Sequence, residues 1–131
     1  MRILLKIIPI LVFILSTCSL SAQVSDYTLT SSSVTIGNEN IAIGSTLSKT
    51  GNDLRWIQQS SETVNITDFQ ITGTSGDWNQ STSMGMVTYN IAMDGDDLGT
   101  FVLEGTTAGV TVILTLDQQQ HSFSINTITY Q

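Results

Sequence analysis

Apolar residues alternate with Thr, Ser and Asn over short runs along most of this chain, and clusters of Gly, Asn and Asp separate the runs at roughly ten-residue intervals. Such alternation puts every second side chain on the same face of a β-strand, and the clusters supply the residues that tight turns require. No stretch after residue 22 shows a helical period. The pattern therefore predicts an all-β fold, either an antiparallel β-sandwich or a small closed meander barrel of about 7–9 short strands.

The C-terminal half carries the clearest alternation, with turns expected at residues 94–99 and 105–109. The last strand changes its apolar face between Ile125 and Ile128, which predicts a bulge or bend near residues 126–127. The residues expected to face one common interior are Val87, Tyr89, Ile91, Phe101, Leu103, Val112, Leu114, Phe123 and Ile125.

The N-terminal half is less regular, and the strands expected there cover residues 27–30, 34–36, 41–43, 54–58 and 64–72. Val64 and Ile66 share one strand face, whereas Phe69 and Ile71 share the other. Because side chains alternate with a period of two, this change of face predicts a bend near residues 67–68.

The first residues have the three parts of a secretory signal peptide, with Arg2 and Lys6 before an apolar run at residues 7–15 and a small polar end at residues 16–22. The remaining segment of about 109 residues is long enough for one independently folding domain. The organisation expected is a signal peptide at 1–22 and a single all-β domain at 23–131, in a secreted or periplasmic protein.

Cys18 carries an alternative for the same segment. Residues 15–18, Leu-Ser-Thr-Cys, resemble a bacterial lipoprotein box, although Thr17 departs from the pattern, so the alternative is a protein anchored by lipid on Cys18. If the signal is instead removed after Ala22, the only Cys leaves with it, and the domain is stable without a disulfide.

The charge of the chain narrows the range of partners. The full sequence carries a formal charge of −7, and without Arg2 and Lys6 two basic residues oppose eleven acidic ones, which gives −9. A surface this negative repels polyanions, so nucleic acid is not an expected partner. No membrane span is expected in the mature chain.

No catalytic or metal-binding constellation stands out, and the chain is expected to be neither an enzyme nor dependent on a cofactor. Ser75, His121 and Asp117 lack the strand-turn-helix context that exposes a hydrolase nucleophile, and His121 is expected half exposed at the start of the last strand. The acidic residues after position 93 do not follow calcium-loop spacing, so the Asp-Gly pair at 94–95 is interpreted as a hairpin turn, with no metal site.

Trp78 is the candidate binding residue, because it lies in the longest polar stretch, residues 73–83, which is expected to be a loop. An exposed Trp between Asp77 and Asn79 could stack on a sugar while its neighbours bind the hydroxyls, and the alternative is that Trp78 plugs one end of the fold. Trp56 shares a strand face with Leu54 and is expected in the core.

These features favour an exported, non-catalytic binding module for a carbohydrate or a surface protein, with a structural or adhesive surface protein as the alternative and an enzyme third. A hollow interior of roughly 300 Å³ or more would favour a small-molecule ligand, and a solid core would favour recognition by the surface. The pattern does not define the oligomeric state.

Overall fold

The structure, a computed structural model, describes residues 25–131. The expected signal segment at 1–22 and Cys18 lie outside these residues. Eleven strands follow one another along the chain: β1 (Tyr27–Ser31), β2 (Val34–Ile36), β3 (Glu39–Ile41), β4 (Gly44–Thr50), β5 (Asp53–Gln59), β6 (Val64–Asn79), β7 (Met84–Met93), β8 (Asp96–Thr106), β9 (Gly109–Leu116), β10 (Gln119–Ser124) and β11 (Thr127–Tyr130).

All eleven strands belong to one antiparallel sheet with the order β11-β1-β4-β5-β6-β7-β8-β9-β10-β2-β3, and the sheet is not closed. The all-β antiparallel prediction is confirmed. The fold is neither a sandwich of two sheets nor a closed barrel, and it has more strands than the 7–9 expected. The count is higher because β4 at Gly44–Thr50 was not expected as a strand, and because a break at residues 125–126 divides the last expected run into β10 and β11. This break confirms the bend expected near residues 126–127.

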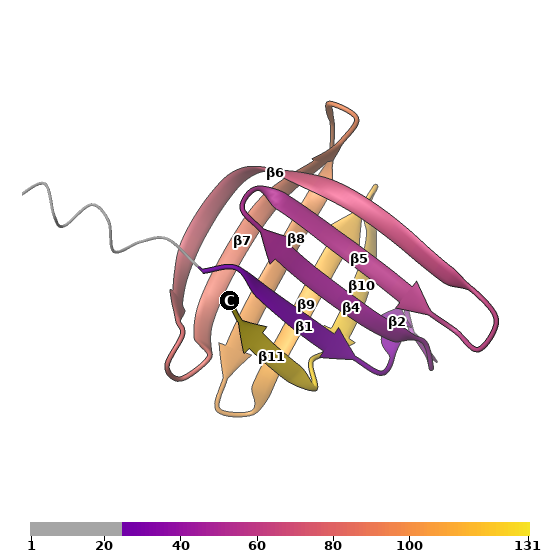
Figure 1. Cartoon of the computed structure of the whole chain (residues 1–131), viewed down its shortest axis with the longest axis horizontal. Coiled ribbons are helices and arrows are strands. Elements are labelled where there is room, and N and C mark those ends of the chain that lie inside the picture. Colours follow the sequence, from indigo (N-terminus) through magenta and orange to yellow (C-terminus); the bar gives the residue numbers. More distant parts are fainter. Residues whose placement is uncertain (1–24) are drawn as a thin grey trace, which may run out of the picture.

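The sheet rolls until its two ends meet, with β1, β4 and β5 forming one layer, β7 to β10 the other, and the long β6 arching from one layer to the other (Figure 1). Near the meeting point β1 pairs with β11, and β2 pairs with β10. The Asn126 amide donates to the Thr30 carbonyl at 2.7 Å, and Ser31 Oγ donates to the Ser124 carbonyl at 2.8 Å. These contacts hold the first and last parts of the sheet together around a shared interior.

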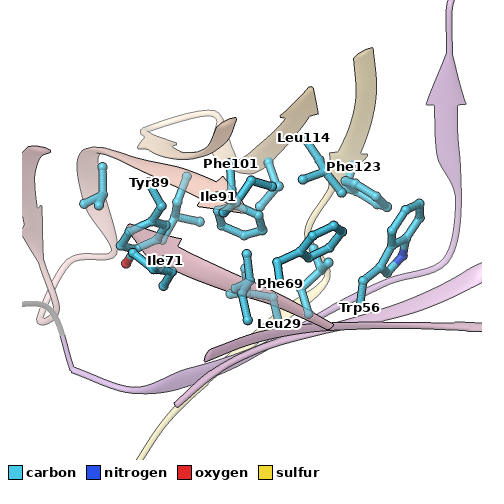
Figure 2. Close-up of a cluster of buried hydrophobic side chains, with 14 of the residues drawn as sticks. Leu29, Trp56, Phe69, Ile71, Tyr89, Ile91, Phe101, Leu114 and Phe123 are labelled. Carbon is cyan, nitrogen blue, oxygen red and sulfur yellow. The ribbon is translucent and has the colours of Figure 1, made fainter. Parts of the chain in front are cut away.

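The interior is filled by apolar side chains. Eight of the nine residues expected to face it are buried, Ile125 is partly buried, and Trp56 lies in the core as expected. Trp56 and Phe123 meet edge to face with ring centroids 5.6 Å apart, and Phe69 and Phe101 extend the cluster toward Tyr89 (Figure 2). The scaffold is therefore solid, stabilised by the burial of large apolar groups.

The polar groups in this interior have partners. Tyr27 Oη donates to Tyr89 Oη at 3.0 Å, and Trp56 Nε1 donates to Ser45 Oγ at 3.1 Å. Burial raises the pKa of the Tyr27 hydroxyl and that of the Tyr89 hydroxyl, which keeps both protonated in the folded protein. The hydrogen bonds remove most of the cost of placing polar atoms among apolar ones.

The structure corrects two expectations about β6. Residues 73–79 are not a loop but the second half of β6, paired with β7 as far as Asn79 and Met84, so that only residues 80–83 connect the two strands. The two backbones approach closely at Gly76, where a Cβ would clash with the Met86 carbonyl oxygen.

The bend expected near residues 67–68 is also wrong. β5 and β6 pair without interruption from Val64 to Gln70, and the register shifts later, between Ile71 and Gly73. The apolar face changes because Val64 and Ile66 point outward into solvent while Phe69 points inward. The change of face is real, but exposure rather than a bend produces it.

Candidate functional site

A groove of about 710 Å³ lies on the outer face of β4, β5 and β6, beside the end of β7. We call it the outer groove. Its lining residues come from four strands and the β7–β8 turn: Ser48, Thr50, Asp53, Arg55, Ile57, Asp68, Phe69, Gln70, Ala92, Met93 and Asp94. Because the core residues Leu54, Trp56 and Phe69 anchor β5 and β6 from the inside, the outward-facing side chains between them are held on a rigid surface.

An ion pair spans the middle of the outer groove. Arg55 on β5 and Asp68 on β6 are direct cross-strand partners, with Arg55 Nε 2.7 Å from Asp68 Oδ1 and Arg55 Nη2 3.2 Å from Asp68 Oδ2. The hydrogen bond from Arg55 lowers the pKa of Asp68, and the same bond raises the pKa of Arg55. The two planar groups therefore meet through two charge-assisted hydrogen bonds on the exposed face of the sheet.

Two further carboxylates line the groove, Asp53 at the start of β5 and Asp94 after β7. Asp53 lies opposite Gln70 in the β5–β6 ladder, and Asp94 begins the β7–β8 turn with a φ of 54°, followed by Gly95 with a φ of 85°. Positive φ at both positions is typical of a two-residue hairpin turn, which confirms the turn expected from the Asp-Gly pair. The turn is shorter than the stretch 94–99 expected, because β8 already begins at Asp96. With Asp68, the lining residues supply three carboxylates against one guanidinium.

One end of the groove is apolar. Ile57 lines the groove and pairs directly with Ile66, and Val64 follows on the same outer face two residues away. Val64 and Ile66 are each 56% exposed. We call Ile57, Val64 and Ile66 the apolar patch. The outer groove therefore carries Asp53 at one end and apolar side chains at the other, with the exposed Arg55–Asp68 ion pair between them.

The structure places Trp78 differently from the expectation of an exposed loop residue. Trp78 lies in β6, partly buried and packed against the core, and its Nε1 donates to Tyr130 Oη at 2.9 Å. Tyr130 Oη also shares a hydrogen bond of 2.8 Å with Ser83 Oγ. Gly105 gives the indole its space, because a Cβ there would lie 2.7 Å from the ring. These contacts tie β11 to the β6–β7 connection.

Asp77 and Asn79 are both exposed. Because side chains alternate along a strand, they lie on the face opposite to Trp78, so the structure does not bring the three candidate residues to one surface. Asn79 Oδ1 accepts hydrogen bonds from the amides of Ser81 and Thr82 at 3.0 and 3.2 Å, which shapes the turn. A ligand contact at these residues stays a prediction.

His121 is buried at 8% exposure, not half exposed as expected. It faces the core from β10, where its Nδ1 lies 3.3 Å from the Leu114 carbonyl oxygen and its ring meets Trp56 edge-on. Ser75 is exposed on β6, four strands away in the sheet order, and Asp117 lies in the β9–β10 turn. The structure therefore does not assemble these three residues.

Within residues 25–131, no group of three or more His, Cys, Asp and Glu side chains is arranged to hold a metal ion. The same part of the chain contains no helix with the length and apolar character that a membrane crossing requires. Comparisons with protein-family models, curated protein sequences and solved structures gave no match.

Proposed function

We propose that this chain is an exported, non-catalytic binding module that recognises its ligand with the outer groove. The observation that carries the proposal is the contrast between a filled interior and a polar groove of about 710 Å³ on the outer face of the same strands. A rolled meander with a solid core is a rigid support, and the energetic cost of binding falls when the recognising groups are already in place. The proposal assigns the inner faces to stability and the outer faces of β4, β5 and β6 to recognition.

Export rests on the signal segment at residues 1–22 and is part of the same proposal. Mass spectrometry of the protein from its own host should find a chain that begins at Gln23. A chain that begins with a lipid-modified Cys18 would support the anchored alternative, and an unprocessed chain that keeps Met1 would contradict export.

A structural or adhesive role through the sheet edges remains the alternative. The two edge strands, β3 and β11, have three and four residues. These two strands offer few free backbone groups for pairing with another chain, whereas residues 73–79 of β6, which pair with β7 alone, form a longer edge that this alternative would use. We place recognition on the outer face because the groove lies there.

A groove-filling variant tests the proposal. Gln70 is exposed in the outer groove on β6, whereas Thr111 is exposed on the outer face of β9. Gln70→Trp should abolish binding to whichever members of a combined peptide and glycan array the protein recognises, and Thr111→Trp, the same bulk on the other layer, should leave binding unchanged. Binding that survives Gln70→Trp, or that only Thr111→Trp removes, would overturn the assignment of the outer groove.

A further inference from the structure

The end of the β5–β6 hairpin carries two of the three large apolar residues that are exposed within residues 25–131, Val64 and Ile66. We call residues 57–66 the arm. In the arm, Ile57, Val64 and Ile66 face outward, whereas the side chain between the last two, Asn65, is polar. Apolar β-branched side chains on an outer face, next to a groove, are typical of a surface that another molecule covers.

The charged residues that line the groove indicate which chemical groups a molecule covering the apolar patch would carry. Asp53 lines the end opposite the apolar patch, and Asp94 lines the β7 side of the groove, level with Asp68 in the β6–β7 register. The Arg55 guanidinium is bonded to Asp68, so the three lining carboxylates outnumber the one lining cation. Charge complementarity calls for a further cation beside Asp53.

The spacing suggests an extended ligand. Asp53 and Ile57 point outward from the same strand, four residues apart, which is about 13 Å at the rise of an antiparallel strand. An extended peptide has the same repeat, so residues four apart in its sequence would reach both ends from one face. Phe69, the aromatic residue among the lining residues, is only 2% exposed, so the groove offers no open ring on which a sugar could stack.

Resting on the proposed function of the outer groove, we propose that its occupant is an extended peptide segment of a partner protein, with a Lys or Arg and an aliphatic residue four positions apart. The cation pairs with Asp53, with Asp94 adding negative charge on the β7 side, and the aliphatic side chain covers the apolar patch. A second copy of this chain does not fit, because residues 25–131 carry two basic residues against eleven acidic ones, and both basic groups form ion pairs within the chain.

Synthetic peptides test the proposal directly. The probe is a fluorescein-labelled heptapeptide with one Lys and one Leu four positions apart in a Thr/Ser background, titrated with the protein and followed by anisotropy. Replacing its Lys by Glu, or changing the spacing to three, which puts the two side chains on opposite faces of a strand, should each weaken binding by about tenfold or more. Equal affinity for all three peptides would overturn the proposal.

Protein variants with matched controls locate the contacts. Asp53→Asn with Asp94→Asn should weaken binding of the Lys/Leu peptide by about tenfold, and Ile66→Thr by about fivefold, whereas Glu104→Gln on β8 and Met86→Thr on β7 should change it less than about twofold. Met86 is an apt control because it is another exposed large apolar residue, at 48%. Losses no larger than those of the controls would contradict the proposal.

The two proposals fail in different ways. If the peptide does not bind but Gln70→Trp removes binding of another array ligand, the outer groove is the site and the basic peptide is the wrong occupant. If Gln70→Trp removes no binding at all, the outer groove itself is wrong.

Discussion

The arm, residues 57–66, and the rest of the rolled sheet, which we call the body, place the same residue types in opposite environments. Val87 and Ile91 on β7 are 0% and 1% exposed, whereas Val64 and Ile66 on β6 are each 56% exposed. In the body, the opposite layer covers the inner face of each strand, and the β5–β6 turn projects beyond that layer at the edge of the molecule (Figure 1). Burial by a facing layer, not residue type, decides which side of a strand supports the fold and which side is free to bind.

The largest expected effect on stability comes from making the same Ile→Ala substitution once in the body and once in the arm. Ile91→Ala should lower the free energy of unfolding by about 2–5 kcal/mol, because it leaves a cavity in a packed core. Ile66→Ala should change it by about 0.5 kcal/mol or less, because the side chain is already in water. Urea denaturation of the two variants measures both values. Similar losses of unfolding free energy in the two variants would mean that the arm is part of the core, and would contradict the contrast between arm and body.

The next prediction asks whether Trp78 contributes to the packed interior of the body. Trp78→Ala should lower the free energy of unfolding by about 3 kcal/mol, at the low end for Trp in a core because the ring is only partly buried. Tyr130→Phe, which removes the acceptor of the indole N–H, should cost about 1 kcal/mol. Thermal or urea melts of both variants give these values. A Trp78→Ala protein with unchanged stability and lost glycan binding would instead support the ligand site expected from the sequence.

The smallest expected effect concerns two carboxyl groups, Asp26 before β1 and Asp68 on the outer face of β6. A hydrogen bond from the Gly51 amide, followed by one from Lys49, lowers the pKa of Asp26, and Arg55 lowers that of Asp68. A lowered pKa in the folded state gives stability that is present above the unfolded value of about 4 and is lost as the pH falls through the folded value. The Asp68 pair is open to solvent and salt, whereas the Lys49 side chain is 11% exposed.

Urea melts between neutral pH and pH of about 2 measure the difference. Asp26→Asn should flatten the acid-side loss of stability more than Asp68→Asn does, and added salt should reduce the Asp68 contribution first. The opposite ranking would show that the ion pair on the outer face, not the contact in the body, supports the fold.

The alternation of residues predicted the all-β fold and most of the interior because burial and strand period act on the same positions. It did not predict the second half of β6, because Gly76 and its polar neighbours have the composition of a loop and become a strand only when β7 lies against them. It identified the outward shift of Val64 and Ile66 but attributed it to a bend, since a period of two shows which residues share a face and not which face is inside.

The outer groove was missed for a related reason. Arg55 and Asp68 are distant in sequence and meet only through the β5–β6 register, and Asp94 comes from a different hairpin. The position of the β5–β6 turn would have been the signal, because it fixes which residues of the two strands lie opposite each other. The sequence placed the expected site at Trp78 because a Trp stands out in a polar stretch. In the structure, its indole N–H already donates to Tyr130 Oη.

The central claim is that this protein recognises a ligand with the outer face of β4, β5 and β6. The most direct test is a titration of isotope-labelled protein with the Lys/Leu heptapeptide, followed by amide chemical shifts. We expect the shifts to concentrate at residues 48–57, 64–70 and 92–94, with little change on β9 and β10. Shifts concentrated on β9 and β10, or around Trp78 and Tyr130, would contradict the claim.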